Sequence, residues 1–422
     1  MGKEQGATEI EPLGVTTTSE TGRSLANGMA LYIHIPFCET KCPYCDFNTY
    51  AGINHLIPSY MEALSNELHT WASALGHPRV NTVFLGGGTP SMLSPKQMND
   101  LFTLIRAEFA VQKDAEVSAE VNPDDVTVER MTGFLEAGLN RISIGVQSFD
   151  DTELQILGRR HNVTQALKAF EAVQHAGFTN VSMDLMYGLP HQNMESWKRN
   201  VEGVITAAPQ HVSAYALTLE PETPMAQRVL KGSVPEQDPD LAADMYEWAT
   251  AALAKAGYRN YEISNWAQPG RESLHNITYW HNLPYLGVGP GAHSFLGGYR
   301  FANGKSPIGY MAKVNAWGEP PADLETLLRE NPGFVQDVEP MDAQTEMSDS
   351  LIMGLRLSEG VRNRDFRGRF GLNLHEVYGD AIKETISLGL LKSNGMWPVA
   401  TIQLTERGKL LANEAFVRFL AD

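Results

Sequence analysis

The chain alternates short apolar runs with longer amphipathic segments between residues 30 and 300, and this alternation limits the folds it can adopt. The apolar runs that read as strands are ALYIHI, NTVFLG, AEVSAEV, RISIGV, NVSMDLMYG and HVSAYALTL. Strands that alternate with helices form βαβ units around a parallel sheet. The repeat occurs about six or seven times, so we expect a partial, six-unit β/α barrel, with a complete eight-unit barrel as the alternative.

The sequence on either side of this region has a different character. Residues 1–28 are polar and rich in Gly, Thr and Glu, which is typical of a disordered extension. After the connections ANGKSP and GEPPADLETLLRENPG come two helix-like segments, the hairpin-like SNGMWPVATIQL and a closing helix. This order predicts a winged-helix-like α+β domain. We therefore expect a barrel domain over residues 29–300 and the second domain over residues 301–422.

The charge balance excludes some classes of partner. The chain has 33 Lys and Arg residues against 50 Asp and Glu residues, a formal net charge of −17. So acidic a chain repels the phosphate backbone, and we expect no generic nucleic-acid binding. No run of about 18 or more apolar residues occurs, so no transmembrane segment is expected. Residues 1–28 lack the apolar core of a secretory signal, which favours a cytoplasmic location.

All three cysteines of the chain, Cys38, Cys42 and Cys45, lie in CETKCPYCDF, directly after a predicted strand. In a chain without a secretory signal, such a group more often binds metal or acts in catalysis than forms disulfides. Iron–sulfur clusters normally have four thiolate ligands, so three thiolates leave one iron of a four-iron cluster open. The alternative is a zinc ion held by the three cysteines and a histidine such as His34.

Other unusual features follow successive predicted strands. GGGTP (residues 86–90) follows NTVFL, Glu120 ends AEVSAE, Gln147 follows RISIGV, and Asp184 lies within NVSMDLMYG. In folds with a parallel sheet, binding side chains gather in the loops at the carboxyl ends of the strands. We therefore expect these residues to surround one site together with the cysteines.

The segment YIHIPFCETKCPYCDF resembles the signature of the radical S-adenosylmethionine (SAM) superfamily. FLGGGTPSML, ISIGVQSFD, LGRRH and DLMYGLP are similar to further motifs of that superfamily. The resemblance implies a radical SAM barrel with a [4Fe–4S] cluster on Cys38, Cys42 and Cys45, whose open iron is chelated by the amino and carboxylate groups of SAM. The positions that it implies for SAM binding are Tyr32, Gly87, Gly88, Thr89, Glu120, Gln147, Arg159 and Asp184.

The residue types suit these implied roles. Glycines let the backbone approach a ligand without a Cβ clash. Arg159 offers a fixed cation for the SAM carboxylate, and Glu120 offers an acceptor for ribose hydroxyl groups. Tyr32 and His34 alternate with aliphatic residues, so the two rings share one face of their strand. His34 is either a residue that supports the cluster ligands or a hydrogen-bonded core histidine, and we favour the second interpretation.

Within the superfamily, the chain resembles the branch of the oxygen-independent coproporphyrinogen III dehydrogenases (HemN) and the heme chaperones (HemW). The dehydrogenase signature has a further cysteine at the position of Phe47, where the chaperones have an aromatic residue. HNITYW, which begins at His275, matches a chaperone motif whose histidine is implicated in heme binding. The resemblance thus implies a heme chaperone whose partner is an acceptor hemoprotein, such as a membrane-bound respiratory enzyme. The alternative is the dehydrogenase, and no catalytic residue is assigned.

Two further interpretations stay open. Residue types alone allow HNITYW to be structural, with Tyr279 and Trp280 in the core, and His281 or His293 could bind heme with His275 or in its place. In the second domain, VRNRDFRGRFG contains four arginines and could mark a DNA-binding winged helix. Its acidic neighbours favour a solvated surface. The resemblance instead implies that this domain covers the barrel mouth or contacts the heme acceptor.

Overall fold

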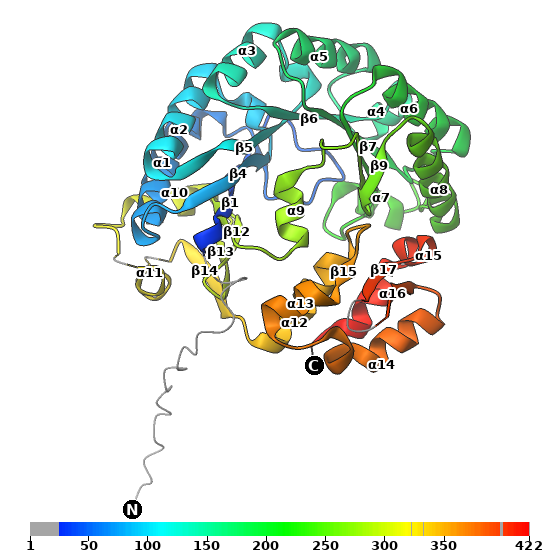
Figure 1. Ribbon diagram of the computed structural model, residues 1–422. Helices are drawn as coiled ribbons and strands as arrows, with labels where there is room; N and C mark the ends of the chain where they lie inside the picture. Colours follow the sequence, from blue (N-terminus) through cyan, green and yellow to red (C-terminus); the bar gives the residue numbers. More distant parts are fainter. Residues whose placement is uncertain (1–24, 322, 332, 397–399, 422) are drawn as a thin grey trace, which may run out of the picture.

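The computed structural model describes residues 25–321, 323–331, 333–396 and 400–421 (Figure 1). The predicted disordered extension therefore lies almost entirely outside the described residues, which begin with the short turn η1 (Leu25–Asn27). Within the described ranges, no helix is both long and apolar enough to span a membrane.

A twelve-stranded sheet is the frame of the molecule, in the order β14-β13-β12-β11-β1-β4-β5-β6-β7-β8-β10-β9. Six strands pair in parallel, each with the next of the six along the chain. They are β1 (Met29–Ile35), β4 (Arg79–Gly87), β5 (Ala110–Val121), β6 (Arg141–Gln147), β7 (Val181–Tyr187) and β8 (His211–Ala216). The predicted partial barrel is confirmed, and the residues that the structure describes do not form the complete eight-unit barrel.

Helices between these strands cover the outer side of the curved sheet (Figure 1). The helices between the strands are α1 (Ile57–Ala74), α2 (Pro95–Glu108), α3 (Val128–Ala137), α4 (Asp151–Ile156), α5 (Val163–His175) and α6 (Met194–Ala207), and α7 (Pro224–Leu230) and α8 (Pro239–Lys255) follow the last of the six strands. Several of these helices begin at a capping box, in which two residues near the helix start exchange side-chain-to-backbone hydrogen bonds. The Ser94 side chain accepts a hydrogen bond from the backbone of Gln97, whose side chain accepts one from Ser94, and this fixes where α2 starts.

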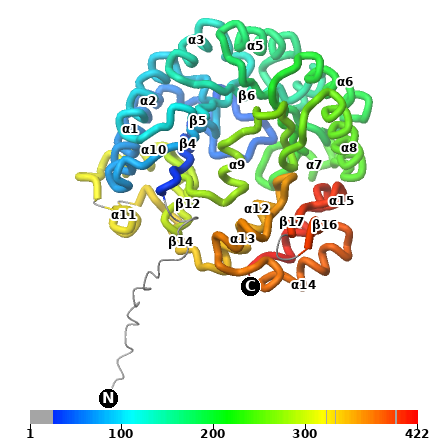
Figure 2. The backbone as a smooth tube through the Cα atoms, in the orientation of Figure 1, coloured from blue at the N-terminus to red at the C-terminus, as the bar shows by residue number. Residues whose placement is uncertain are grey.

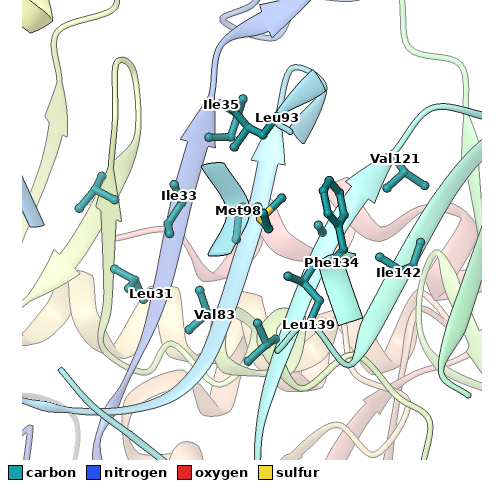
Figure 3. Packing of buried hydrophobic residues seen from close by; sticks show 14 of the residues in the cluster. Leu31, Ile33, Ile35, Val83, Leu93, Met98, Val121, Phe134, Leu139 and Ile142 are labelled. Carbon is teal, nitrogen blue, oxygen red and sulfur yellow. The ribbon is translucent and has the colours of Figure 1, made fainter. Parts of the chain in front are cut away.

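The main core lies between the sheet and these helices. Leu31, Ile33 and Ile35 of β1 are fully buried in it, and Figure 3 shows them beside side chains of neighbouring strands and helices. Because side chains alternate along a strand, Tyr32 and His34 point to the inner side of the arc, where both line a cavity. The strand face predicted for these two rings is therefore the face toward the site.

Further strands, all but β11 antiparallel to their inner neighbours, extend both edges of the sheet. One edge carries β10 (Asn265–Ala267) and β9 (Arg259–Glu262). At the other edge, β11 (Tyr285–Val288) pairs in parallel with β1 and is followed by β12 (His293–Leu296), β13 (Tyr299–Asn303) and β14 (Val335–Pro340). The short helix α9 (Leu274–Trp280) connects the two edges and lies inside the arc of the barrel in Figures 1 and 2.

The C-terminal part has the predicted combination of helices and a small sheet. Its three strands are antiparallel in the order β15-β17-β16. Its elements are α12 (Ala343–Leu355), β15 (Val361–Arg362), α13 (Asn363–Phe370), α14 (Leu374–Ser387), β16 (Leu391–Asn394), β17 (Thr401–Leu404), α15 (Glu406–Leu410) and α16 (Ala412–Phe416). The buried apolar residues from Leu351 onward form a cluster separate from the main core.

The domain boundary at residue 300 stays a prediction. Beyond it, α10 (Pro307–Asn315) and α11 (Leu324–Glu330) precede β14, and Tyr310, Leu327 and Phe334 are buried in the main core. Apolar side chains of this connection thus pack with the barrel.

Candidate functional site

The three cysteines lie on the loop between β1 and α1, which also forms the short strands β2 (Phe37–Cys38) and β3 (Tyr50–Ala51). All three are unpaired and partly exposed, and all line one cavity of about 470 Å³. The Thr89 hydroxyl lies 3.5 Å from the Cys38 sulfur, and a guanidinium nitrogen of Arg159 lies 3.6 Å from the Cys42 sulfur. The cysteine loop is therefore open to a ligand on its cavity side.

The donor set fits an iron–sulfur cluster better than a zinc ion. No three His, Cys, Asp or Glu side chains of the described residues converge on a point that one metal ion could occupy. A cluster needs no such point because each thiolate binds a different iron. In the zinc alternative, His34 is the fourth ligand. Its Nδ1 lies 3.0 Å from the Tyr32 hydroxyl and its Nε2 lies 2.9 Å from the Asn48 carbonyl oxygen, so neither ring nitrogen is free.

The structure brings most of the predicted SAM residues to the cavity with the cysteines. The lining residues from the predicted set are Gly87, Gly88, Thr89, Glu120, Gln147, Arg159 and Asp184. They come from the carboxyl ends of β4, β5 and β6, from the middle of β7 and from the segment before α5. Since parallel strands end at one edge of the sheet, residues far apart in the chain meet there. Their role in SAM binding stays a prediction.

The glycines of GGGTP pack against the cysteine loop as well as facing the cavity. Gly87 has φ of 99°, and a Cβ there would overlap the ring of His34. A Cβ on Gly88 would lie 2.6 Å from the carbonyl oxygens of Ile35 and Phe37. The amides of Gly88 and Thr89 donate to these same two oxygens, each at 2.8 Å. These hydrogen bonds hold the two segments so close together that a side chain at position 87 or 88 would not fit between them.

Two carboxylates lie on the inner wall. The Ser143 hydroxyl donates to both carboxylate oxygens of Asp184, at 2.9 and 3.0 Å. Burial raises the pKa of Asp184. Burial and the negative charge of Asp184 raise the pKa of Glu120 to about 7, although the Gly87 amide donates to Glu120 at 3.3 Å. A group that donates hydrogen bonds to Glu120 would favour its ionised form.

Arg159 is held in a fixed position beside the cysteines, and Gln147 lines the same cavity. The Arg159 guanidinium donates to the Asn122 side-chain oxygen at 2.5 Å and to the Gly145 carbonyl oxygen at 3.1 Å. Its Nε is buried without a partner among the described residues. Gln147, at the end of β6, has φ of 69°, a left-handed conformation that costs energy in a residue with a side chain. Such strain is frequent at binding sites.

A second cavity, of about 710 Å³, adjoins the first. The residues that line both are Lys41, Asp46, Phe47, Thr49, Phe84, Gly87 and Glu120. Tyr32, the remaining predicted SAM residue, lines only this second cavity. Its walls include aromatic and basic side chains, namely Tyr279, Trp280, Tyr285, Lys41, Arg300 and Lys305. Tyr285, Lys41, Arg300 and Lys305 were not predicted as site residues, because no spacing or motif distinguishes them from surface residues of the same types.

His275, the predicted heme residue, lines neither cavity. It is 1% exposed, and burial lowers its pKa to about 3. Its Nδ1 is hydrogen-bonded to the Thr82 hydroxyl and its Nε2 to the Tyr279 hydroxyl, both at 2.8 Å. The Phe84 ring stacks on it with 5.1 Å between ring centroids. In this conformation, neither nitrogen is available to iron, and heme binding by His275 stays a prediction.

The arginines of VRNRDFRGRFG are mostly paired with acidic residues. Arg369 pairs with Glu346 at 2.9 Å and donates to the carbonyl oxygens of His281 and Asn282. Arg362 pairs with Glu359 and Asp365, and Arg364 pairs with Asp365. The cluster thus links the C-terminal part to the end of α9, and its charge is largely balanced, which weakens the DNA-binding alternative.

Sequence models of two families match the chain. The radical SAM superfamily matches residues 32–202, and the HemN C-terminal domain matches residues 341–411. Heme chaperone HemW of Bacillus subtilis is 34% identical over 93% of this chain and 99% of its own length. Heme chaperone HemW of Escherichia coli is 36% identical over 93% of this chain and 98% of its own length.

A bovine relative and a solved structure are also similar. Radical S-adenosyl methionine domain-containing protein 1, mitochondrial, of Bos taurus is 38% identical over 86% of this chain and 81% of its own length. The structure of coproporphyrinogen III oxidase (HemN) from Escherichia coli matches with a TM-score of 0.77 and 24% identity, covering 93% of this chain and 89% of that one. At 24% identity, the structural match shows that the two chains share a fold.

Proposed function

Because this chain belongs to the heme chaperone HemW family of the radical SAM superfamily, we propose that it binds heme and passes it to an acceptor hemoprotein. The observation that carries this proposal is the aromatic-walled cavity of about 710 Å³ beside the three cysteines. Flat aromatic faces suit a porphyrin. The volume lies within the range of about 300–1,000 Å³ typical of small-molecule sites.

The radical SAM family implies a [4Fe–4S] cluster and SAM, and we propose that Cys38, Cys42 and Cys45 hold the cluster. When bound, the cluster supplies a redox-active iron centre with one open coordination position. Burial raises the pKa of Cys38 and of Cys45, so these thiolates gain from a cationic group in the cavity. The Arg159 guanidinium beside Cys42 adds a fixed positive charge.

The predicted SAM residues fit that ligand chemically. Arg159 is held by Asn122 and Gly145, so its guanidinium can pair with a carboxylate without reordering. Glu120 lines the same cavity and can accept hydrogen bonds from ribose hydroxyl groups. Tyr32 fits the set less well, because its hydroxyl is hydrogen-bonded to His34 and lines the other cavity.

Phe47 argues against the dehydrogenase alternative. Its ring is 62% exposed and lies where the two cavities meet, at the position of the additional dehydrogenase cysteine. An exposed apolar ring there suits contact with a flat apolar cargo. The identity of the acceptor and the cytoplasmic location are further parts of this proposal, and they rest on the family and on the unpaired cysteines.

The test is an anaerobic heme titration of the cluster-loaded protein, followed through the Soret band. The same samples are then given SAM and coproporphyrinogen III. Stoichiometric heme binding, release of that heme to an added apo-hemoprotein and no protoporphyrinogen formation are the expected results. Steady protoporphyrinogen formation with weak heme binding would overturn the proposal and favour the dehydrogenase.

A further inference from the structure

We propose that heme occupies the larger cavity with its iron on His293, rather than on His275, and with its two propionates on Lys41 and Lys305. This inference rests on the proposed function, since it names the site of the same cargo. All three residues line the cavity of about 710 Å³, and they come from the cysteine loop, β12 and the turn after β13. The site therefore forms only when segments more than two hundred residues apart meet.

His293 has the accessibility that an iron ligand needs. It is exposed, lines the cavity, and has no side-chain hydrogen-bond partner among the residues that the structure describes. His281, the other histidine near this segment, lines a different pocket, with its Nε2 3.7 Å from a Glu359 oxygen. A neutral imidazole with a free nitrogen is a common axial ligand of heme iron.

The backbone around His293 is rigid. Strand β12 lies between β11 and β13, with His293 opposite Ala302. The preceding turn is anchored by buried Glu67, which accepts hydrogen bonds from the Gly289 amide at 2.7 Å and from the Asn303 side chain at 2.6 Å. A ligand on a strand with such support stays in one position, which suits metal binding.

Lys41 and Lys305 are cations without acidic partners. Lys41 donates to the carbonyl oxygens of Phe47 and Thr49, at 3.0 and 3.4 Å, and Lys305 is exposed. Within the described ranges, neither has a carboxylate at ion-pair distance. Arg300 differs, because it pairs with Asp349 at 2.9 Å.

In a chain of net charge −17, two unpaired ammonium groups at one cavity are suited to an anionic ligand. The acidic side chains on the same cavity are Asp46 and Glu120. A dicarboxylate cargo with a flat apolar body matches this combination of lysines and aromatic walls.

His275 is instead a positioning residue. To reach iron it would have to break its bonds to Thr82 and Tyr279 and leave the core. By holding the Tyr279 hydroxyl, it fixes one aromatic wall of the cavity. Its replacement would therefore weaken heme binding through the wall and leave the iron ligand in place.

The first experiment compares His293→Ala, His275→Ala and the matched control His281→Ala by anaerobic heme titration of cluster-loaded protein. We expect His293→Ala to lose the spectrum of histidine-ligated heme. Its affinity for heme should fall by at least about tenfold, because even the loss of a residue that only supports a metal ligand costs about that much. Added imidazole should restore the spectrum in this variant. His275→Ala should retain the histidine-ligated spectrum, and His281→Ala should match the unmodified protein.

The second experiment tests the propionates with heme and with its dimethyl ester. The double variant Lys41→Gln with Lys305→Gln should bind heme more weakly and bind the ester as the unmodified protein does. An unchanged spectrum in His293→Ala, or loss of the histidine signature only in His275→Ala, would overturn the proposal while the chaperone function stands. If the unmodified protein itself binds no heme, the proposed function fails first.

Discussion

The Nε2 atom of His275 lies 2.8 Å from the hydroxyl oxygen of Tyr279, and this hydrogen bond connects a buried histidine to a ring on the wall of the larger cavity. The Tyr279 ring in turn packs edge-on against Tyr285, with 4.7 Å between ring centroids. The HNITYW segment is thus a support on which an aromatic surface is built. Substitutions in it will affect both folding and the cavity.

Replacing His275 by Ala should lower the free energy of unfolding by about 2–4 kcal/mol, because it leaves a void and removes two buried hydrogen bonds. Thermal unfolding measures this loss. His281→Ala, at an exposed side chain, should stay within about 0.5 kcal/mol of the unmodified protein. A fully stable His275→Ala variant would contradict the structural role.

Stability should decrease in mild acid. Burial lowers the pKa of His275 to about 3 and that of His161 to about 4, from an ordinary value of 6.5. Between those values and 6.5 the unfolded chain binds protons that the folded chain does not, so stability falls as the pH falls through this range. Thermal unfolding as a function of pH should show a smaller decrease for His275→Phe. Equal decreases for both proteins would argue against this assignment.

Replacing Cys38, Cys42 or Cys45 singly by Ser should abolish the cluster, since three thiolates already leave one iron without a protein ligand. The broad absorbance at about 400 nm after anaerobic reconstitution measures the cluster. Iron and sulfide analysis of the same samples provides the stoichiometry. A variant that retains a full cluster would refute the ligand assignment.

Phe47→Cys should not by itself create decarboxylation of coproporphyrinogen III. The position lies between both cavities, but the larger cavity keeps its aromatic walls and lysines in this variant. Product analysis with SAM and a reductant tests it, with Phe47→Ala as the control for loss of the ring. Turnover in the cysteine variant alone would mean that this one position separates the two activities.

Gly87→Ala should weaken SAM binding and stability together. The new Cβ would overlap the His34 ring, and φ of 99° is unfavourable for alanine. Gly270→Ala is the matched control, because Gly270 also has positive φ, 77°, but has nothing within 4 Å of an added Cβ. The difference between the two variants in thermal unfolding and SAM titration isolates the steric overlap. Equal effects would mean that the loss of stability comes from backbone strain alone and not from the overlap with His34.

Much of the fold and of the smaller cavity was predictable from the sequence. The strand–helix alternation predicts the parallel sheet, because each strand has the period and apolar content of a buried strand. Glu120 and Gln147 lie at the carboxyl ends of β5 and β6, and parallel strands bring their ends to one edge. Asp184 lines the same cavity from the middle of β7. The strands β12 to β14 were not predicted, because they are short and antiparallel and their pairing depends on long-range contacts.

The sequence by itself determined which elements form and which strand ends carry polar side chains, since both follow from local periodicity. Only the tertiary structure decided that His275 is enclosed by Thr82, Phe84 and Tyr279, whereas His293 is exposed on the cavity wall. Burial and hydrogen-bond partners depend on packing between β4, α9 and β12. The sequence shows where the histidines are, whereas the residues that surround each histidine in the folded protein determine whether a ligand can reach it.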